Sequence, residues 1–296
     1  MGKRAAIVGF FDGVHLGHQK LIDELERYAA EHDLEPLIVS FNQHPKSVTC
    51  AGFIPVMLQT QPDRTQMLLS HRNCTLQLFD FTPAFAEKSS REFMQILHTE
   101  YNVDAILLGY NNRFGCDKDF TPQKAVQTAA ELGMDLVVST PLLYKDLPIS
   151  SSRIRRELSQ GNITDANSML GWNYYVSGTV VKGLQNGRKI GFPTANINPD
   201  CINNLIPERG VYAAYVILDG KRYAAMANVG YNPTIAEHNH LSVEAHILDF
   251  DRNIYGKRLT LEFASRIRNE QRFSSLEELA AQLCKDREQI RALLEQ

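Results

Sequence analysis

Two histidines stand three residues apart near the start of the chain, where the stretch that begins at Gly9 reads GFFDGVHLGHQ. A short apolar run precedes this stretch and an amphipathic pattern follows it, so we expect a strand, a turn and then a helix that begins near Leu16. His15 and His18 would then share one face of the first helical turn. The free N–H groups and the positive dipole end at such a helix start suit phosphate.

Phosphoryl and nucleotidyl transfer need in-line positioning and stabilisation of charge that develops on phosphate oxygens. Two imidazoles beside a helix N-terminus meet that need, and ligands of open α/β sheets bind at the carboxyl edge of the strands. The same spacing also suits half a metal site or a pair of surface histidines, and spacing alone leaves these alternatives open. The strand, turn and helix around the pair favour phosphate chemistry.

A second stretch, residues 182–196, joins glycines, cations and a Thr/Asn pair and reads KGLQNGRKIGFPTAN. Glycines let a backbone approach phosphates closely, and bare N–H groups in such turns bind anions. Thr194 and Asn196 are two apart, so in an extended segment both side-chain oxygens would face one side. Hard oxygen donors together with nucleotide phosphates suit Mg²⁺. The alternative is a β-hairpin with an Asn-Gly turn at 186–187 that needs no ligand.

Glu244 is the third candidate for chemistry. In the strand-like run SVEAHILDF it alternates onto the same face as His246. A carboxylate that is partly desolvated at a barrel mouth could accept a proton from a primary hydroxyl. The opposite face carries Val243, Ala245 and Ile247 and is equally apolar, so periodicity does not settle which face is the core. A solvent-exposed glutamate therefore stays an alternative.

The first half of the chain must position the histidines. Up to Ser139, strand-length apolar runs such as AAIVGF, PLIVSF, DAILLGY and DLVVST alternate with the helical patterns LIDELERYAAEH, EFMQILHTEY and PQKAVQTAAELG. This alternation is typical of a parallel sheet wrapped by helices. The first half is predicted to be a Rossmann-like α/β domain.

The second half changes its pattern after Trp172. The runs YYVSGTVV, GVYAAYVILD, KRYAAMANVG, SVEAHILDF and RLTLEFASRI are rich in β-branched and aromatic residues, and turn-forming residues separate them. Five such runs without intervening helices favour an antiparallel barrel or sandwich. We expect a mainly-β domain, built as an antiparallel β-barrel.

Two helical segments complete the expected organisation. Residues 155–172 read as one or two short helices with a Gly-Asn break. Near the end, Ser274-Ser275-Leu276-Glu277 fits a capping box that opens a terminal helix. Its apolar stripe, which should pack on the barrel, consists of Leu276, Leu279, Leu283, Ile290 and Leu294. The predicted domains are residues 1–157 and 173–296, joined by a helical connector over 158–172.

Composition sets the class of protein. The chain has 296 residues, 44% of them apolar and 22% charged, which is ordinary for a globular protein of two domains. Its 31 basic and 34 acidic residues give a net charge of −3, so no overall basic field would hold a nucleic acid. The five cysteines are scattered without CxxC spacing, and no apolar stretch is long enough to span a bilayer. We therefore expect a soluble cytoplasmic protein.

The stretch around the histidines resembles a known family. The string HLGH is similar to the HxGH signature of nucleotidyltransferases, and GFFDGVHLGHQ resembles the FMN adenylyltransferase half of prokaryotic bifunctional riboflavin kinase/FAD synthetases. Three more strings follow in that family's order. FNQHP departs from the family's F-x-P-H-P at Gln43, GYNNRFG keeps an Asn at position 111, and ISSSRIR has Ser152 where Thr is usual. The serine cluster alone would also fit an ordinary helix N-cap.

The second half resembles the kinase part of the same family. GFPTAN at 191–196 is similar to the riboflavin kinase signature G-x-P-T-A-N, and VEAHILDF resembles the strand that bears the base. The strings GVYA at 210–213 and NVGYNPT at 228–234 also match. The resemblance covers nearly the whole chain, in the family's domain order.

This resemblance implies two reactions. The β half would phosphorylate the ribityl 5′-hydroxyl of riboflavin from MgATP, with Glu244 as base and with Thr194 and Asn196 at the metal. The α/β half would then join AMP to FMN, which releases pyrophosphate and gives FAD.

For the second reaction the resemblance implies that His15, His18 and Arg155 stabilise the transition-state charge. Asn111 would bind phosphate. Further nucleotide- or flavin-binding positions implied by the matching motifs are Gly9, Phe10, Asp12, Gly13, His44, Ser151, Ser152, Gly183, Arg188, Gly191 and Pro193.

The expected partners are small molecules: ATP, riboflavin and FMN, with Mg²⁺ as MgATP, and no nucleic acid or membrane. A weak or transient homo-oligomer stays open. One rival hypothesis is a nucleotidyltransferase for another phosphorylated substrate, against which the GFPTAN domain argues. The other is a flavin- or nucleotide-binding regulator without turnover, against which the intact set of motif residues argues.

Overall fold

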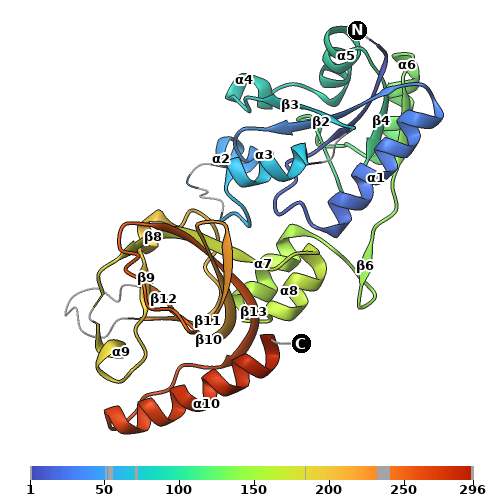
Figure 1. Cartoon of the computed structure of the whole chain (residues 1–296). Helices are drawn as coiled ribbons and strands as arrows, with labels where there is room; N and C mark the ends of the chain where they lie inside the picture. The colour runs from blue at the N-terminus through green and yellow to red at the C-terminus, as the bar shows by residue number, and fades with distance from the viewer. Residues whose placement is uncertain are drawn as a thin grey trace. The chain divides into compact units, whose positions relative to one another are not determined.

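The computed structural model describes residues 2–50, 52, 56–70, 73–183, 185–231 and 241–294 (Figure 1). The chain divides into two compact units, Met1–Ser151 and Ser152–Gln296.

The N-terminal unit is built on a five-stranded sheet in the order β3-β2-β1-β4-β5. All neighbouring strands run parallel. The strands are β1 (Arg4–Val8), β2 (Glu35–Phe41), β3 (Thr75–Phe79), β4 (Val103–Leu108) and β5 (Asp135–Val138). The α/β prediction is confirmed, and β3 is a strand that the sequence patterns missed. Because β1 lies between β2 and β4, the sheet reverses its order of growth there, where doubly wound folds bind ligands.

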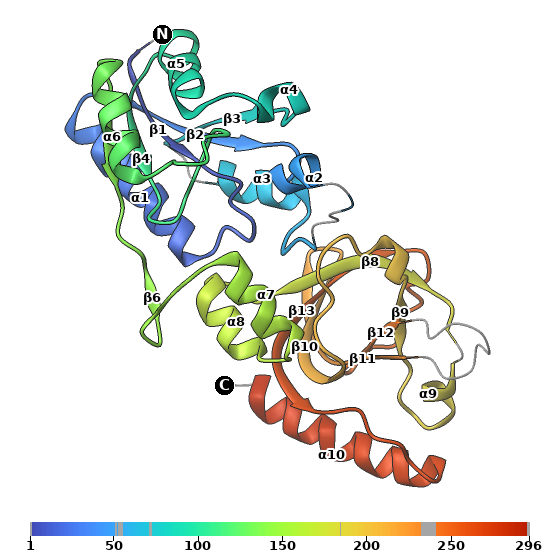
Figure 2. The same ribbon diagram turned by 180° about the vertical axis from the view of Figure 1, so that it is seen from behind.

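Helices cover both faces of this sheet (Figures 1 and 2). On one face α1 (Leu16–Glu31) and α3 (Gln61–Leu69) pack on the strands, and on the other α5 (Ser90–Tyr101) and α6 (Pro122–Glu131) do so. The helix predicted to begin near Leu16 does begin there. Two short helices, α2 (Pro45–Thr49) and α4 (Pro83–Ala86), follow strands β2 and β3, and a two-stranded hairpin joins β6 (Leu143–Tyr144) to β7 (Leu147–Pro148).

The C-terminal unit begins with two helices, and the predicted connector over 158–172 includes only the end of the first and all of the second. They are α7 (Ser151–Ser159) and α8 (Ile163–Leu170), with Gly161 and Asn162 between them. The helix α8 packs on the barrel, where the amide of Asn167 donates to the Phe263 carbonyl at 2.8 Å.

A closed six-stranded antiparallel barrel forms the body of this unit, in the order β10-β11-β12-β9-β8-β13. The strands are β8 (Tyr175–Val181), β9 (Ala195–Ile197), β10 (Gly210–Leu218), β11 (Lys221–Tyr231), β12 (Leu241–Ile247) and β13 (Arg258–Arg268). Five of them are the predicted runs. The sixth, β9, lies inside the GFPTAN motif and has only three residues, too few to show an alternating pattern. A short helix, α9 (Asn186–Lys189), and a 3₁₀ turn, η1 (Pro199–Cys201), flank β9.

The terminal helix α10 (Leu276–Leu294) lies along the outside of the barrel (Figure 1). Ile290 is fully buried against β10 and β11, and Leu283 and Leu294 pack beside it, as predicted. Leu276 is 51% exposed, so its place in the apolar stripe was wrong. The cap also differs by one residue, because the Ser275 hydroxyl accepts from the Glu278 amide at 3.2 Å.

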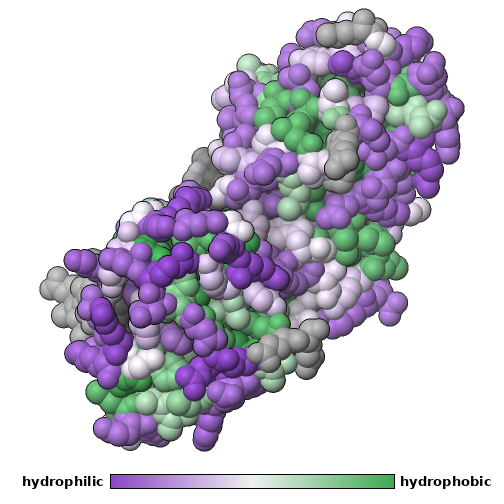
Figure 3. Space-filling model, in the orientation of Figure 1, coloured by the Kyte–Doolittle hydropathy of each residue, from purple (hydrophilic) through white to green (hydrophobic). Residues whose placement is uncertain are grey.

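Within the part of the chain that the structure describes, no helix is both long and apolar enough to cross a membrane. The face drawn in Figure 3 is mainly hydrophilic, with separate hydrophobic areas.

Candidate active sites

The two histidines of the first motif lie side by side at the start of α1. His15 caps the helix, and its Nδ1 accepts a hydrogen bond from the backbone N–H of His18 at 3.3 Å. The two rings stack with centroids 3.6 Å apart. The predicted shared face is therefore present, at a helix start where backbone donors and imidazoles converge.

The environment of His18 disfavours its charged form. Burial, His15 and Arg64 together hold the pKa of His18 well below its ordinary value, with burial the largest cause. Its Nδ1 is buried and has no hydrogen-bond partner among the described residues. A buried ring nitrogen without a partner is unusual in a folded protein.

The loop between β1 and α1 has a strained backbone. Phe11 and Val14 adopt positive φ angles of 56° and 34°, beside Gly13 at 81°. Positive φ is costly for a β-branched residue, and such strain gathers at functional sites. Burial of Phe11 and Val14, at 3% and 0% exposure, holds the loop in this shape.

Two buried charged residues support the loop. The carboxylate of Asp12 accepts from the Leu58 amide at 3.0 and 3.2 Å and from the Gln59 amide at 3.4 Å. Arg64 is 1% exposed, donates to the carbonyl of Phe10, and places its guanidinium 3.9 Å from the centre of that ring. Burial lowers the pKa of Arg64 to about 10, against the attraction of Asp12. Asp12 thus has a structural task, and its predicted contact with a ligand stays a prediction.

The loop after β4 meets the loop after β1. The amide of Asn112 donates to the carbonyl of Val8, which ties the two strand ends together at the point where the sheet changes direction. Asn111 beside it is exposed. The phosphate-binding role of Asn111 stays a prediction, and the motif alone did not reveal the different task of its neighbour.

His44 lies beside the first motif. Its ring packs edge-on against Phe10 with centroids 4.8 Å apart, and its Nδ1 caps α2 by accepting from the Lys46 amide at 3.1 Å. Gln43, where the chain departs from the family pattern, donates to the Phe81 carbonyl at 2.8 Å. The departure therefore has a local structural use.

The serine motif reaches the same loop. The Ser151 hydroxyl donates to the backbone carbonyl of Asp12 at 2.9 Å. Ser152 and Arg155 lie in the first turns of α7 and belong to the C-terminal unit. Within the N-terminal unit, then, four separate motif strings gather at the carboxyl edge of β1 and its neighbours.

The second candidate site is set by strand register. Pairing of β9 with β12 places Asn196 opposite Glu244, and pairing of β11 with β12 places Asn228 opposite the same glutamate. The three residues form one row across the barrel wall, since paired residues share a face. The Thr194 hydroxyl donates to the Glu244 carboxylate at 2.9 Å. Glu244 is half-buried, as the partly desolvated alternative predicted.

The glycine loop before β9 packs closely on this row. A Cβ on Gly183 would lie 2.5 Å from the Asn196 amide group, so any other residue there would displace that side chain. Gly191 has a φ of 82°, which favours glycine. Residues 186–189 form the short helix α9 rather than an Asn-Gly hairpin, so that alternative was wrong. Arg188 on α9 is exposed, and Leu184 lies outside the described residues.

A cavity of about 510 Å³ opens beside these residues. Arg188, Pro193 and Thr194 line it together with the loop from Phe250 to Tyr255. This size falls within the range typical of small-molecule pockets, about 300–1,000 Å³. Three predicted ligand-binding residues therefore share one cavity. Part of the NVGYNPT string, residues 232–234, lies outside the described residues.

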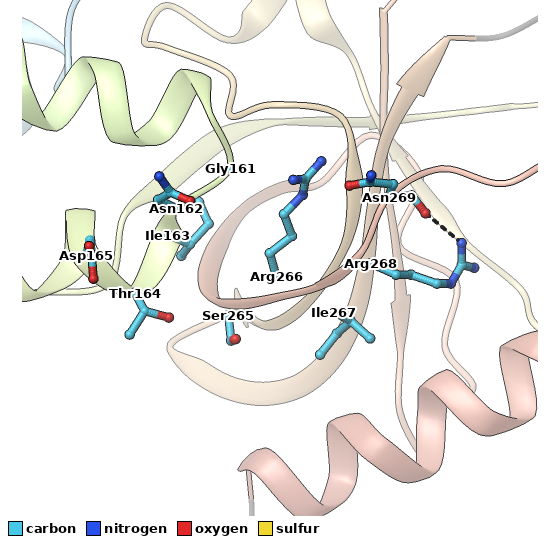
Figure 4. Close-up of a pocket in the computed structure, with 10 residues that line it drawn as sticks. All are labelled: Gly161, Asn162, Ile163, Thr164, Asp165, Ser265, Arg266, Ile267, Arg268 and Asn269. Carbon is cyan, nitrogen blue, oxygen red and sulfur yellow. Dashed lines mark hydrogen bonds between the residues drawn. The ribbon is translucent and has the colours of Figure 1, made fainter.

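A second cavity of about 500 Å³ lies between the start of α8 and the end of β13 (Figure 4). Its two arginines are engaged within the fold. Arg266 extends toward Gly161 and donates to the Arg209 carbonyl, and Arg268 pairs with Asp286 at 2.8 Å. The first contact holds Arg266 beside Gly161 in the turn between α7 and α8, and the second ties β13 to α10, so both arginines have structural roles.

The comparisons with known proteins agree with this geometry. Residues 2–153 match the FAD synthetase family and residues 170–294 match the riboflavin kinase family. The chain is 33% identical to the bifunctional riboflavin kinase/FMN adenylyltransferase of Listeria monocytogenes, over 96% of this chain and 90% of the relative. It is 32% identical to the enzyme of the same name from Bacillus subtilis, over 97% and 91%. The chain belongs to the bifunctional riboflavin kinase/FMN adenylyltransferase family.

A solved structure from Streptococcus pneumoniae is also similar, with a TM-score of 0.87, 30% identity and coverage of 98% of this chain and 94% of that one. It is described as a macrolide-efflux protein. The two matched families give this chain an FAD synthetase domain followed by a riboflavin kinase domain. The chain is an enzyme that takes riboflavin to FMN and FMN to FAD.

Proposed function

We propose that each reaction has its own site, with phosphorylation of riboflavin assigned to residues 173–296 and adenylylation of FMN to residues 1–157. Residues 158–172 connect them. The contact that carries the kinase assignment is the 2.9 Å hydrogen bond from the Thr194 hydroxyl to the Glu244 carboxylate. It places an alcohol donor on a half-buried carboxylate, and Thr194 itself lines a ligand-sized cavity.

In the kinase reaction Glu244 accepts the proton of the ribityl 5′-hydroxyl while that oxygen attacks the γ-phosphorus of ATP, whose bond to the β–γ bridging oxygen breaks so that ADP leaves. The Thr194 hydroxyl marks where a hydroxyl can approach this carboxylate. Thr194 and Asn196 offer oxygen donors next to Glu244, a donor set that fits Mg²⁺. When bound as MgATP, the ion would neutralise charge on the phosphate oxygens. Gly183, Arg188, Gly191 and Pro193 shape the loop that receives the nucleotide.

In the adenylylation reaction a phosphate oxygen of FMN attacks the α-phosphorus of ATP, and pyrophosphate leaves. The stacked pair at the start of α1 supports this assignment. His15, His18 and Arg155 stabilise the charge that develops on the phosphate oxygens, and Asn111 binds phosphate. Since its pKa is low, His18 is neutral before substrate binds and acts as a hydrogen-bonding group. The loop residues assigned to nucleotide and flavin are Gly9, Phe10, Asp12, Gly13, His44, Ser151 and Ser152.

The assignment includes a cytoplasmic location, in keeping with free thiols at all five cysteines. A weak homo-oligomer remains part of the hypothesis.

The direct test is chromatography of riboflavin incubated with MgATP and the protein. We expect FMN first and FAD later, with both products dependent on a divalent cation. Flavin that stays entirely as riboflavin would overturn the kinase assignment, and FMN that never becomes FAD would overturn the adenylylation assignment.

A further inference from the structure

His246 follows Glu244 by two residues on β12, and the kinase mechanism above does not use it. Its side chain is 9% exposed, and its Nδ1 lies 2.8 Å from the backbone carbonyl of Pro193. Its ring packs edge-on against Phe192, with centroids 5.1 Å apart. Both contacts go to the GFPTAN motif, immediately before Thr194.

The partner fixes the form of the imidazole. A carbonyl oxygen can only accept, so Nδ1 must carry a proton. Burial, the largest cause, and the nearby Arg287 lower the pKa of His246, while the bond to Pro193 opposes them. The side chain is therefore neutral at pH 7, with its proton on Nδ1 and a lone pair on Nε2.

The Pro193 carbonyl, which accepts the hydrogen bond from His246, belongs to the peptide unit that leads to Thr194. A peptide unit is planar, so the Pro193 carbonyl, the Thr194 N–H and the Thr194 Cα lie in one plane. Proline has no N–H of its own, and Pro193 is exposed, so few contacts orient this plane from the solvent side. Among the hydrogen bonds of the described residues, the one from His246 holds the carbonyl, and Thr194 then reaches Glu244.

We propose that His246 is a positioning residue of the kinase reaction: its Nδ1–H bond to Pro193 orients the Pro193–Thr194 peptide so that the Thr194 hydroxyl meets the Glu244 carboxylate. The proposal rests on the roles assigned above to Thr194 and Glu244. The strand β12 thus carries both the base, Glu244, and His246, which positions Thr194 beside that base. A rigid strand is well suited to this, because catalytic groups need support within fractions of an ångström.

Packing alone is the competing explanation. The Phe192 ring is 4% exposed and has the Arg287 guanidinium 5.5 Å from its centre, on the side of α10. His246 would then serve only to fill space beside Phe192. The two explanations differ in which part of the side chain matters, the ring or the Nδ1 donor.

Two substitutions at this position separate ring from donor. His246→Phe keeps an aromatic ring against Phe192 and removes the donor. His246→Asn removes the ring and keeps an N–H donor, because the Asn amide nitrogen is as many bonds from Cβ as the imidazole Nδ1 is. Arg287→Met is the matched control, since it changes the far side of Phe192 and leaves the bond to Pro193 in place.

The assay measures kcat and KM for riboflavin phosphorylation, with adenylylation of supplied FMN on the same samples as a check of folding. We expect His246→Phe to lower the kinase kcat by about 30- to 100-fold, as for an ångström-scale misplacement, with a smaller change in the KM for riboflavin. His246→Asn should stay within about fivefold of the parent, because the donor is retained. Arg287→Met should leave kcat unchanged.

Equal losses in His246→Phe and His246→Asn, or no loss in His246→Phe, would overturn the proposal. Glu244→Gln in the same assay tests the underlying site, since unchanged phosphorylation there would remove the proposed function rather than this inference alone. If the variants do not fold, a measurement on the unaltered protein still tests the proposal. Nitrogen-15 NMR should find the proton of neutral His246 on Nδ1, and a proton on Nε2 instead would contradict the proposal.

Discussion

The two candidate sites are assembled from different kinds of backbone. The site of the N-terminal unit consists of loops at the carboxyl ends of parallel strands, with Phe11 and Val14 at positive φ angles of 56° and 34°. The site of the C-terminal unit consists of strand residues in register, with Asn196 and Asn228 both opposite Glu244. One site depends on a strained loop that burial holds in place, and the other depends on ladder hydrogen bonds.

The difference matches the chemistry proposed for each site. Adenylyl transfer needs donors aimed at phosphate oxygens, and the backbone N–H groups at a helix start supply them. Proton abstraction by Glu244 needs one carboxylate held against one hydroxyl, and neighbouring strands supply fixed side-chain pairs. Substitutions should therefore affect one reaction at a time, through loop geometry in the first unit and through register in the second.

The largest effect is expected for Glu244→Gln. The amide keeps the shape of the side chain and can still accept from Thr194, but it cannot take a proton. Riboflavin phosphorylation should fall by about 10²- to 10⁴-fold, the usual contribution of a general base. Adenylylation of supplied FMN should not change. Phosphorylation at the rate of the unaltered enzyme would show that Glu244 is not the base.

The next effect is expected for Gly183→Ala. The added methyl group would lie 2.5 Å from the Asn196 amide and would push that side chain away from Glu244 and Thr194. Steady-state kinetics should give a kinase rate lower by about 10- to 100-fold, as for a misplaced group, and a raised KM for MgATP.

Gly220→Ala is the control for this clash. Gly220 has a φ of 74° in the turn between β10 and β11, and nothing lies within 4 Å of an added Cβ. Alanine there should cost about 1–2 kcal/mol of stability through its left-handed backbone and leave the kinase rate unchanged. Equal kinetic losses in both variants would indicate a general effect of destabilisation rather than displacement of Asn196.

In the N-terminal unit, Asp12→Ala should loosen the loop that presents the histidines. It leaves the buried amides of Leu58 and Gln59 without their acceptor, which costs about 1–3 kcal/mol. Denaturant unfolding should detect this loss, and FMN adenylylation should slow while riboflavin phosphorylation continues. Asp12→Asn keeps one acceptor oxygen and should be milder. A stability equal to that of the unaltered protein would contradict the assigned role.

The smallest expected effect is on the pH dependence of stability. It can be tested in each unit separately. The pKa of His18 and the pKa of His246 are both lowered in the folded chain, chiefly by burial. The unfolded chain binds protons at these residues below about pH 6.5, whereas the folded chain resists them, so stability should fall as the pH drops below that value. The slope reaches at most about 1.4 kcal/mol per pH unit for each histidine.

Thermal unfolding between pH 7.5 and 5.5 checks this expectation. His18→Gln and His246→Asn should each make the melting temperature less dependent on pH, one through each unit. An unchanged pH dependence in both variants would contradict the role of burial.

The sequence patterns predicted the elements that repeat and missed those that do not. Alternating apolar runs predicted the parallel sheet and five barrel strands, and the motif predicted the start of α1 at Leu16. The sixth strand, β9, has only three residues, too few to show an alternating pattern, and β3 has no fully buried residue. The family resemblance named Thr194 and Glu244, and the structure added the hydrogen bond between them.

Sequence patterns could not predict the contacts between residues far apart in the chain that support the loop after β1. Arg64 lies far along the chain from Phe10, and a charged side chain in an amphipathic helix is ordinarily expected on the surface. The carboxylate of Asp12 contacts amides that are 46 and 47 residues away. Only the folded chain reveals which polar residues hold the loop and which remain for a ligand.

The central claim is that the chain has two separate active sites, and the double variant His15→Ala with His18→Ala tests it most directly. Riboflavin and MgATP are incubated with this variant, and the flavins are separated by chromatography after its folding is checked. The account predicts that FMN accumulates at nearly the unaltered rate while FAD does not form. Loss of FMN formation in the folded double variant, or FAD formation at the unaltered rate, would contradict it.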